Sequence, residues 1–127
     1  MLQADQSWKL QEGDRALAYN IMYQRISDYL NENGIERVIV KASAVTTGSM
    51  RKAHLHAAEL RGVVIAASAA VTKVNMLAKA HVSRTFGERK VDEYVADDAF
   101  WSASVAGKSL RKGSREAAMM ILAARDA

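Results

Sequence analysis

The sequence predicts an α/β domain, and three features of residues 37–70 carry that prediction. An apolar β-branched run, Val38 to Val40, is followed at 42–49 by a segment of small residues and threonines. A long alanine-rich run comes next, and its glycine, Gly62, lies inside it instead of at its end. Strand, polar loop and helix in this order make an α/β unit, in which ligands bind at the carboxyl end of the strand.

The chain before this unit predicts an edge strand and a helix. Residues 8–11 alternate weakly between apolar and polar side chains, which is typical of an edge strand. Across 15–33 apolar residues recur at steps of three and four, so we expect an amphipathic helix. Asp14 can cap the start of that helix, and Gly34 can end it in the left-handed conformation. The buried strand itself is expected at 35–40.

The chain from the polar loop onward predicts further short elements. A helix is expected from about Ser49 to Ala70 because alanine dominates, although the β-branched content of its second half leaves a strand as the alternative. The remaining expectations, in order, are a polar break at 72–75, a short strand or helix at 74–82, a loop at 83–87, a helix at 89–101, a basic loop at 106–113, and a terminal helix capped by Ser114.

Size and composition limit the class of protein. At 127 residues, half of them hydrophobic and a quarter charged, the chain predicts one soluble domain spanning 1–127. No apolar run reaches the roughly 20 residues that cross a bilayer, so we expect no membrane partner, and no leader-like start is seen, which favours the cytoplasm. The lack of cysteine excludes disulfides and thiolate chemistry. The net charge of +4 and the pI near 9.5 favour a polyanionic partner such as nucleic acid.

The middle of the chain resembles a known family. The run VIVKASAVTTGSMRKAHLHAAELRGVVIAA is similar to the strand, loop and helix of RuvC-type Holliday-junction resolvases, members of the ribonuclease H-like superfamily. Ala57, Ala58, Leu60, Arg61 and Gly62 match the centre of that family's helix. The run SREAAMMILAARD is similar to the family's last helix, and the resemblance covers about residues 14–127.

The resemblance implies a three-layer ribonuclease H-like fold in a partial or divergent form. The family's first strand lies at the centre of its sheet, and this sequence contains no counterpart of it. Without that strand the remaining strands would expose unpaired backbone groups. We therefore expect a second copy of the chain to complete the sheet, which makes a homodimer.

The same resemblance implies carboxylates that hold Mg or Mn for phosphodiester hydrolysis. Lys41 stands where the strand-end glutamate is expected, and Gly113 stands where a carboxylate is expected three residues before Glu116. Glu116 is the one acid that matches, so it is the candidate metal ligand and the first catalytic candidate, followed by Glu59 and Asp92. An active enzyme would be a Mg- or Mn-dependent, structure-selective endonuclease. Because Lys41 and Gly113 stand where carboxylates are expected, we favour a chain that binds nucleic acid without hydrolysing it.

Basic residues beside both polar loops predict contacts with a nucleic-acid backbone. At helical spacing Arg51, His54 and Arg61 lie on one side, close to a helix start that favours anions. A solvated helix face is the alternative, and a solubilising loop is the alternative for the basic run at 108–115. The predicted nucleic-acid contacts are Lys41, Thr46, Thr47, Ser49, Arg51, Lys52, Arg61, Lys108, Arg111, Lys112 and Arg115.

Two other clusters have simpler interpretations than metal binding. His54 and His56 are two residues apart, and exposed histidines explain them better than a metal site does. The acidic run at 92–98 can pair with Arg89 and Lys90.

The sequence thus predicts a RuvC-like domain that binds branched or structured nucleic acid, with DNA favoured over RNA. An inactive dimer scaffold for protein interaction or regulation is the first alternative. A small-molecule enzyme that uses the threonine-glycine loop is the second.

Overall fold

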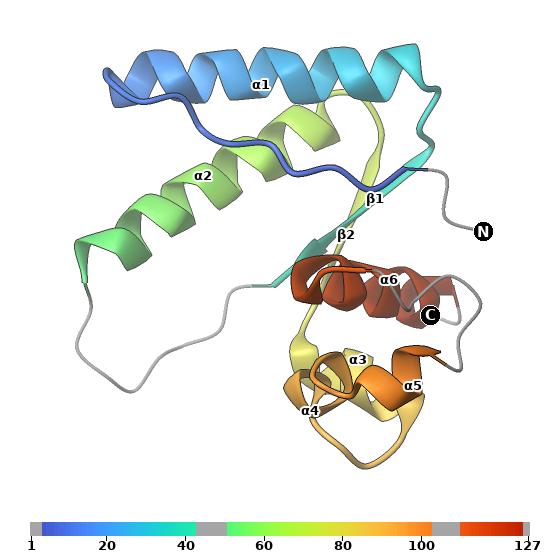
Figure 1. The fold of residues 1–127 in the computed structure, drawn as a ribbon. Coiled ribbons are helices and arrows are strands. Elements are labelled where there is room, and N and C mark those ends of the chain that lie inside the picture. Colours follow the sequence, from blue (N-terminus) through green and yellow to red (C-terminus); the bar gives the residue numbers. More distant parts are fainter. Residues whose placement is uncertain (1–3, 43–50, 103–109, 126–127) are drawn as a thin grey trace. The chain divides into compact units, whose positions relative to one another are not determined.

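The computed structural model describes residues 4–42, 51–102 and 110–125, which form six helices and two strands (Figure 1). The chain divides into two compact units. The strand unit is Trp8–Asn75, and the helical unit joins residues 4–7 to the described residues from Met76 onward. The prediction of a single domain spanning 1–127 stays a prediction.

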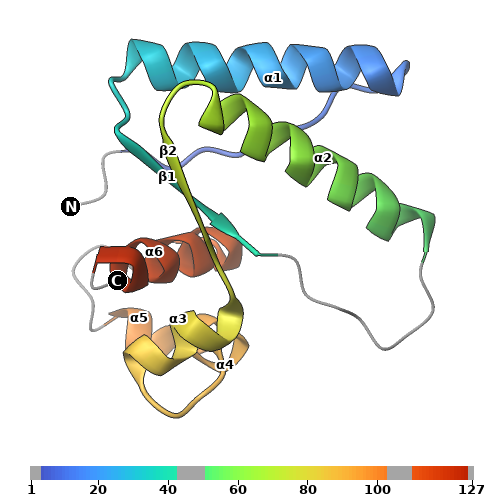
Figure 2. The same ribbon diagram turned by 180° about the vertical axis from the view of Figure 1, so that it is seen from behind.

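The strand unit contains two long helices and most of a small sheet. Its elements are α1 (Arg15–Glu32), β1 (Arg37–Lys41), α2 (Lys52–Ala69) and the start of β2 (Lys73–Leu77). The strands β1 and β2 are parallel neighbours and lie side by side in both views (Figures 1 and 2). The mixed α/β class is confirmed, with helix predominating, whereas the ribonuclease H-like arrangement stays a prediction.

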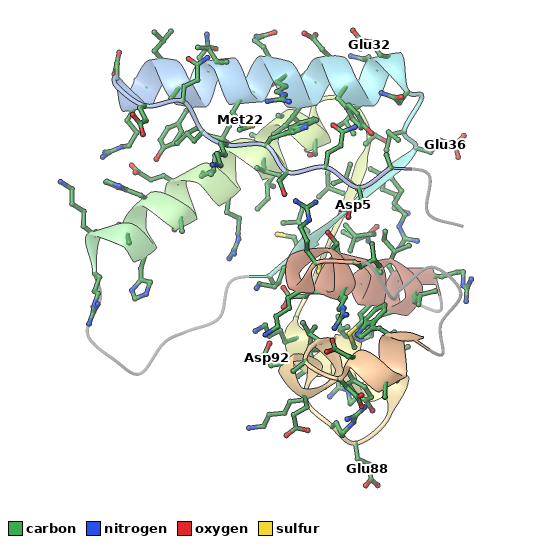
Figure 3. The ribbon with its side chains drawn as sticks, in the orientation of Figure 1. Asp5, Met22, Glu32, Glu36, Glu88 and Asp92 are labelled. Carbon is green, nitrogen blue, oxygen red and sulfur yellow. The ribbon has the colours of Figure 1, made fainter. Side chains whose placement is uncertain are left out.

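Helix α1 forms where the sequence predicts it. The Asp14 carboxylate accepts a hydrogen bond from the Ala16 N–H at 3.2 Å, which caps the first turn. The buried side of the helix is built at steps of four by Ala18, Met22, Ile26 and Leu30. Met22 points from α1 toward α2 (Figure 3). The chain leaves the helix through Gly34, whose φ of 59° is the left-handed conformation that was expected.

The predicted edge strand at residues 8–11 is wrong, and Trp8 of this segment packs on helix α1. The segment has no strand structure, and the Trp8 ring meets the Tyr29 ring edge-on with centroids 5.2 Å apart. The Arg25 guanidinium lies 4.3 Å from the Trp8 centroid, a cation–π geometry. The weak alternation of side chains therefore reflects which residues contact α1.

Helix α2 has two different halves. In its second half Leu60, Val64 and Ala67 pack into the core of the strand unit, so the helical interpretation of this run is correct. Its first half is almost wholly exposed, and Leu55 retains 54% of its accessible surface. The predicted start at Ser49 lies outside the described residues.

The helical unit packs its longest helix against two shorter ones. Its helices are α3 (Lys79–Phe86), α4 (Val91–Val95), α5 (Asp98–Ser102) and α6 (Lys112–Arg125), and α6 contacts α3 and α4. The core of this unit consists of the buried residues Val82, Val91, Tyr94, Val95, Trp101, Met119, Met120, Ala123 and Ala124.

Several predicted boundaries in this part of the chain are wrong. The polar break at 72–75 is largely strand β2, and the loop at 83–87 is mostly the end of α3, which stops at Gly87. The helix at 89–101 is divided in two, because the Asp97 carboxylate accepts the Phe100 N–H at 3.0 Å and starts α5. That hydrogen bond, together with the Arg89 guanidinium, lowers the pKa of Asp97.

The terminal helix also starts earlier than the sequence predicts. Helix α6 begins at Lys112, so Ser114 lies in its first turn and is not its cap. Of the predicted basic loop at 106–113, the last two residues belong to α6, and residues 106–109 lie outside the described part of the chain.

Candidate functional site

The predicted basic side of α2 is exposed in the structure. Arg51 and His54 are exposed, Arg61 is half-buried, and Ala58 between them is exposed. Arg51, His54 and Arg61 are termed the basic stripe from here on. By helical spacing Arg51 and His54 lie away from Leu60 and Val64, which pack toward the core, whereas the half-buried Arg61 lies at the margin between the two sides.

The start of α2 has no acidic side chain in its first turn. Arg51 precedes the helix in an extended conformation, and its backbone N–H donates to the His54 Nδ1 at 3.2 Å. The ring nitrogen of His54 thus accepts one of the hydrogen bonds available at the helix start. The positive end of the helix dipole and the exposed cations Arg51 and Lys52 act in the same direction, so this end of α2 favours an anion.

The single carboxylate of α2, Glu59, is directed toward α1. Its Oε1 lies 3.3 Å from the Arg15 Nε and accepts a hydrogen bond from the Tyr19 hydroxyl at 3.1 Å. Arg15 also contacts the His56 Nε2 at 2.6 Å. Partial burial and the Glu59 carboxylate raise the pKa of Tyr19, so the hydroxyl stays protonated and donates at neutral pH. Glu59, a catalytic candidate, therefore links two helices in the structure.

The remaining predicted contacts of the strand unit are partly outside the described residues. Lys41 is half-buried at the last position of β1. Thr46, Thr47 and Ser49 fall in residues 43–50, outside the described chain.

Two of the three catalytic candidates share one place in the helical unit. Asp92 and Glu116 both line an open hollow of about 350 Å³, together with Val95, Ala96, Lys112 and Gly113. The Lys79 Nζ lies 3.1 Å from the Asp92 Oδ1 and 3.9 Å from the Glu116 Oε2. The sequence predicted the two acids separately, but it gave no sign of the lysine between them.

Lys79 bears on whether this hollow suits a divalent ion. A Mg or Mn site needs several oxygen ligands with a net negative charge, and here an ammonium group already faces both carboxylates. Among the described residues no group of three or more His, Asp or Glu side chains is placed to hold a metal. The donor set fits a lysine counter-ion better than Mg or Mn, and the metal site at Glu116 stays a prediction.

The basic residues at the start of α6 have separate environments. Arg115 is buried, with 6% of its surface exposed, and it donates to the Val95 carbonyl at 2.9 Å and to the Asp98 carboxylate at 2.8 Å. Its guanidinium is therefore part of the interior and does not present a surface to a phosphate. Arg111 and Lys112 are exposed, and Lys108 lies outside the described residues.

Arg111 contacts a residue that sequence reasoning missed. Its Nη2 lies 3.1 Å from the Asp5 Oδ1, its Nη1 donates to the Ser7 hydroxyl at 2.7 Å, and the Ser114 hydroxyl donates to the Asp5 Oδ1 at 2.6 Å. The Ser114 hydrogen bond, followed by Arg111, lowers the pKa of Asp5, so this carboxylate is ionised at neutral pH.

Comparison with known proteins gives no relative for this chain. No family model, no curated protein and no solved structure matches it. Within the described ranges, none of the helices combines the length and the apolar character needed to cross a bilayer.

Proposed function

We propose that this chain is a RuvC-like nucleic-acid-binding domain that contacts the backbone of branched or structured DNA through the basic stripe of α2. One observation carries the proposal: the only carboxylate of α2, Glu59, pairs with Arg15 and Tyr19 on the α1 side. The stripe itself contains no carboxylate, and it adjoins a helix start that has no acidic first turn. A surface of this kind attracts phosphates.

The length of the stripe matches the dimensions of duplex DNA. Arg51 and Arg61 are ten residues apart, which along a helix corresponds to about 15 Å. The major groove is about 12 Å wide. The two arginines can therefore contact phosphates on opposite sides of one groove, while the small Ala58 between them allows close approach.

The proposed domain binds without cutting and acts as a homodimer. Two cations support binding without cutting: Lys41 stands at the end of β1, where the resemblance implies a glutamate, and the Lys79 Nζ lies 3.9 Å from the Glu116 Oε2. Each strand of the two-stranded sheet also has one edge without a strand neighbour in the described chain, which supports pairing with a second copy.

The first test is a binding assay on a labelled four-way junction, a matching duplex and a single strand across a salt series. We expect junction-selective binding that weakens steeply with salt. In the double variant Arg51→Gln/Arg61→Gln we expect the slope of log K against log salt to decrease in magnitude by about 2, because two phosphate contacts are lost.

The matched control is Lys9→Gln/Lys73→Gln, which removes the same charge from two exposed positions of the strand unit. Its slope should stay close to that of the parent chain. If the slope of log K against log salt decreases equally in both double variants, the stripe is not the binding surface. If the parent chain binds none of the three probes at low salt, the nucleic-acid function is wrong and the protein-interaction scaffold replaces it.

A cleavage assay on the same junction separates binding from hydrolysis. We expect the DNA to stay intact with Mg, with Mn and with a chelator, because Lys79 faces the two carboxylates of the hollow. Metal-dependent cuts that disappear in Glu116→Gln would contradict this expectation and identify an active endonuclease.

A further inference from the structure

We propose that the Asp5 carboxylate occupies a phosphate-binding position formed by Arg111 and Ser114, so that residues 4–7 compete with nucleic acid for the start of α6. The inference rests on the proposed nucleic-acid function, because Arg111 is one of the nucleic-acid contacts that the sequence predicts. It adds an internal competitor that regulates access to that residue.

The contact joins residues that are far apart in the sequence. Asp5 and Ser114 are 109 positions apart, and their hydrogen bond is 2.6 Å long. Arg111 holds the same segment with both of its terminal nitrogens, one 3.1 Å from the Asp5 Oδ1 and the other 2.7 Å from the Ser7 hydroxyl. The guanidinium and the hydroxyl of Ser114 thus converge on one carboxylate oxygen.

The groups that hold Asp5 are those that recognise phosphate. A guanidinium and a hydroxyl bind carboxylate and phosphate oxygens with the same geometry. Helix α6 supplies no acidic residue in its own first turn, so the anion at this place comes from a distant part of the chain. An open hollow of about 280 Å³ lies here, lined by Asp5, Gln6, Ser7, Arg111, Gly113, Ser114 and Ala117. Space is therefore available for a group larger than a carboxylate.

The contact is also exposed enough to be displaced. The Arg111 side chain retains 56% of its accessible surface and the Asp5 side chain 29%. Ion pairs this close to solvent contribute little to stability. A backbone phosphodiester carries one negative charge and two non-bridging oxygens, as a carboxylate does, so it can take the place of Asp5 at Arg111 and Ser114. Inorganic pyrophosphate carries more charge than either group.

The test compares Asp5→Asn with the parent chain. Asparagine keeps the size of the side chain and removes its charge. Two probes are used: the four-way junction, and inorganic pyrophosphate titrated while the amide NMR signals of Ser7 and Ser114 are followed. We expect Asp5→Asn to bind both probes about two- to fivefold more tightly, the factor that corresponds to one exposed ion pair.

Glu88→Gln is the matched control, since Glu88 lies in the same unit at an exposed turn, away from any labelled neighbour (Figure 3), and the charge change is the same. Arg111→Gln should weaken pyrophosphate binding and abolish the effect of Asp5→Asn in the double variant. Tightening by Asp5→Asn that does not exceed that of Glu88→Gln would overturn the inference.

The two probes keep this inference separate from the proposed function. If the chain binds the junction in a salt-sensitive way and Asp5→Asn leaves that binding unchanged, the competition by Asp5 is wrong and the proposed function stands. Suppose instead that pyrophosphate shifts the Ser114 signal and binds more tightly to Asp5→Asn, but the junction does not bind. The phosphate-binding position is then supported, and the nucleic-acid function is wrong. Far-ultraviolet circular dichroism of each variant confirms that the helices are intact.

Discussion

Replacing Trp101 by alanine is expected to lower the free energy of unfolding of the helical unit by about 3–5 kcal/mol. Trp101 retains only 4% of its surface, and its ring packs against Phe100 with centroids 5.5 Å apart. The indole N–H donates to the Tyr94 carbonyl at 3.0 Å. The truncation therefore leaves a cavity and removes one of two donors to the Tyr94 carbonyl, which still accepts from the Asp97 N–H at 3.1 Å.

Urea denaturation followed by far-ultraviolet circular dichroism measures this loss. The chain has two tryptophans, and Trp8 lies in the strand unit, so its fluorescence in the variant reports on that unit alone. Trp101→Phe, which retains a ring but no donor, should lie between the parent and the alanine variant. A loss below about 0.5 kcal/mol, the range of surface substitutions, would show that the packing of Trp101 does not stabilise the helical unit.

Gly87→Ala is expected to destabilise the helical unit by about 2–4 kcal/mol. Gly87 ends α3 with φ of 140° and ψ of −144°, a conformation that residues with a side chain rarely adopt. A Cβ atom at this position would lie 2.7 Å from the Tyr94 hydroxyl oxygen. Strain in the backbone and displacement of the Tyr94 ring therefore act together.

Gly113→Ala is the matched control in the same unit. Gly113 lies in α6, and a Cβ atom there has no neighbour within 4 Å, so alanine should leave stability unchanged or raise it by about 0.5–1 kcal/mol. Both variants are compared by the midpoint of thermal unfolding. If Gly87→Ala unfolds at the same temperature as Gly113→Ala, the strained conformation at Gly87 is not needed.

The elements that the sequence predicts well are those whose signals are local. Helix α1 could be predicted because its capping carboxylate, its buried residues and its terminal glycine all lie within about 20 consecutive positions. The basic stripe of α2 could be predicted for the same reason, since helical spacing alone brings Arg51, His54 and Arg61 to one side.

The elements that the sequence predicts poorly depend on contacts between distant segments. Trp8 resembles a strand residue, but it packs on Tyr29 and Arg25, which no local pattern indicates. Residues 83–86 look like a loop, although Phe86 contacts the rings of Tyr94 and Phe100 and is held in α3. Such short helices are determined by tertiary packing more than by propensity.

The candidate site also combines features that local sequence predicts with features that depend on distant contacts. Glu116 and Asp92 could be named from the sequence, but their shared hollow and Lys79 between them require the fold of α3, α4 and α6. Asp5 could not be found at all, because it meets Arg111 from 106 positions away. The basic run around Arg115 predicted a surface cation, but in the structure the buried Arg115 guanidinium donates a hydrogen bond to the Val95 carbonyl.

The way the two units divide the sequence sets an order of events during synthesis. The strand unit is continuous, Trp8–Asn75, so it can fold once its own residues have left the ribosome. The helical unit needs residues 4–7 as well as α6. At about 5–20 residues per second, the 106 positions between Asp5 and Arg111 correspond to roughly 5–20 s. Residues 4–7 are thus made well before the residues that hold them in the helical unit.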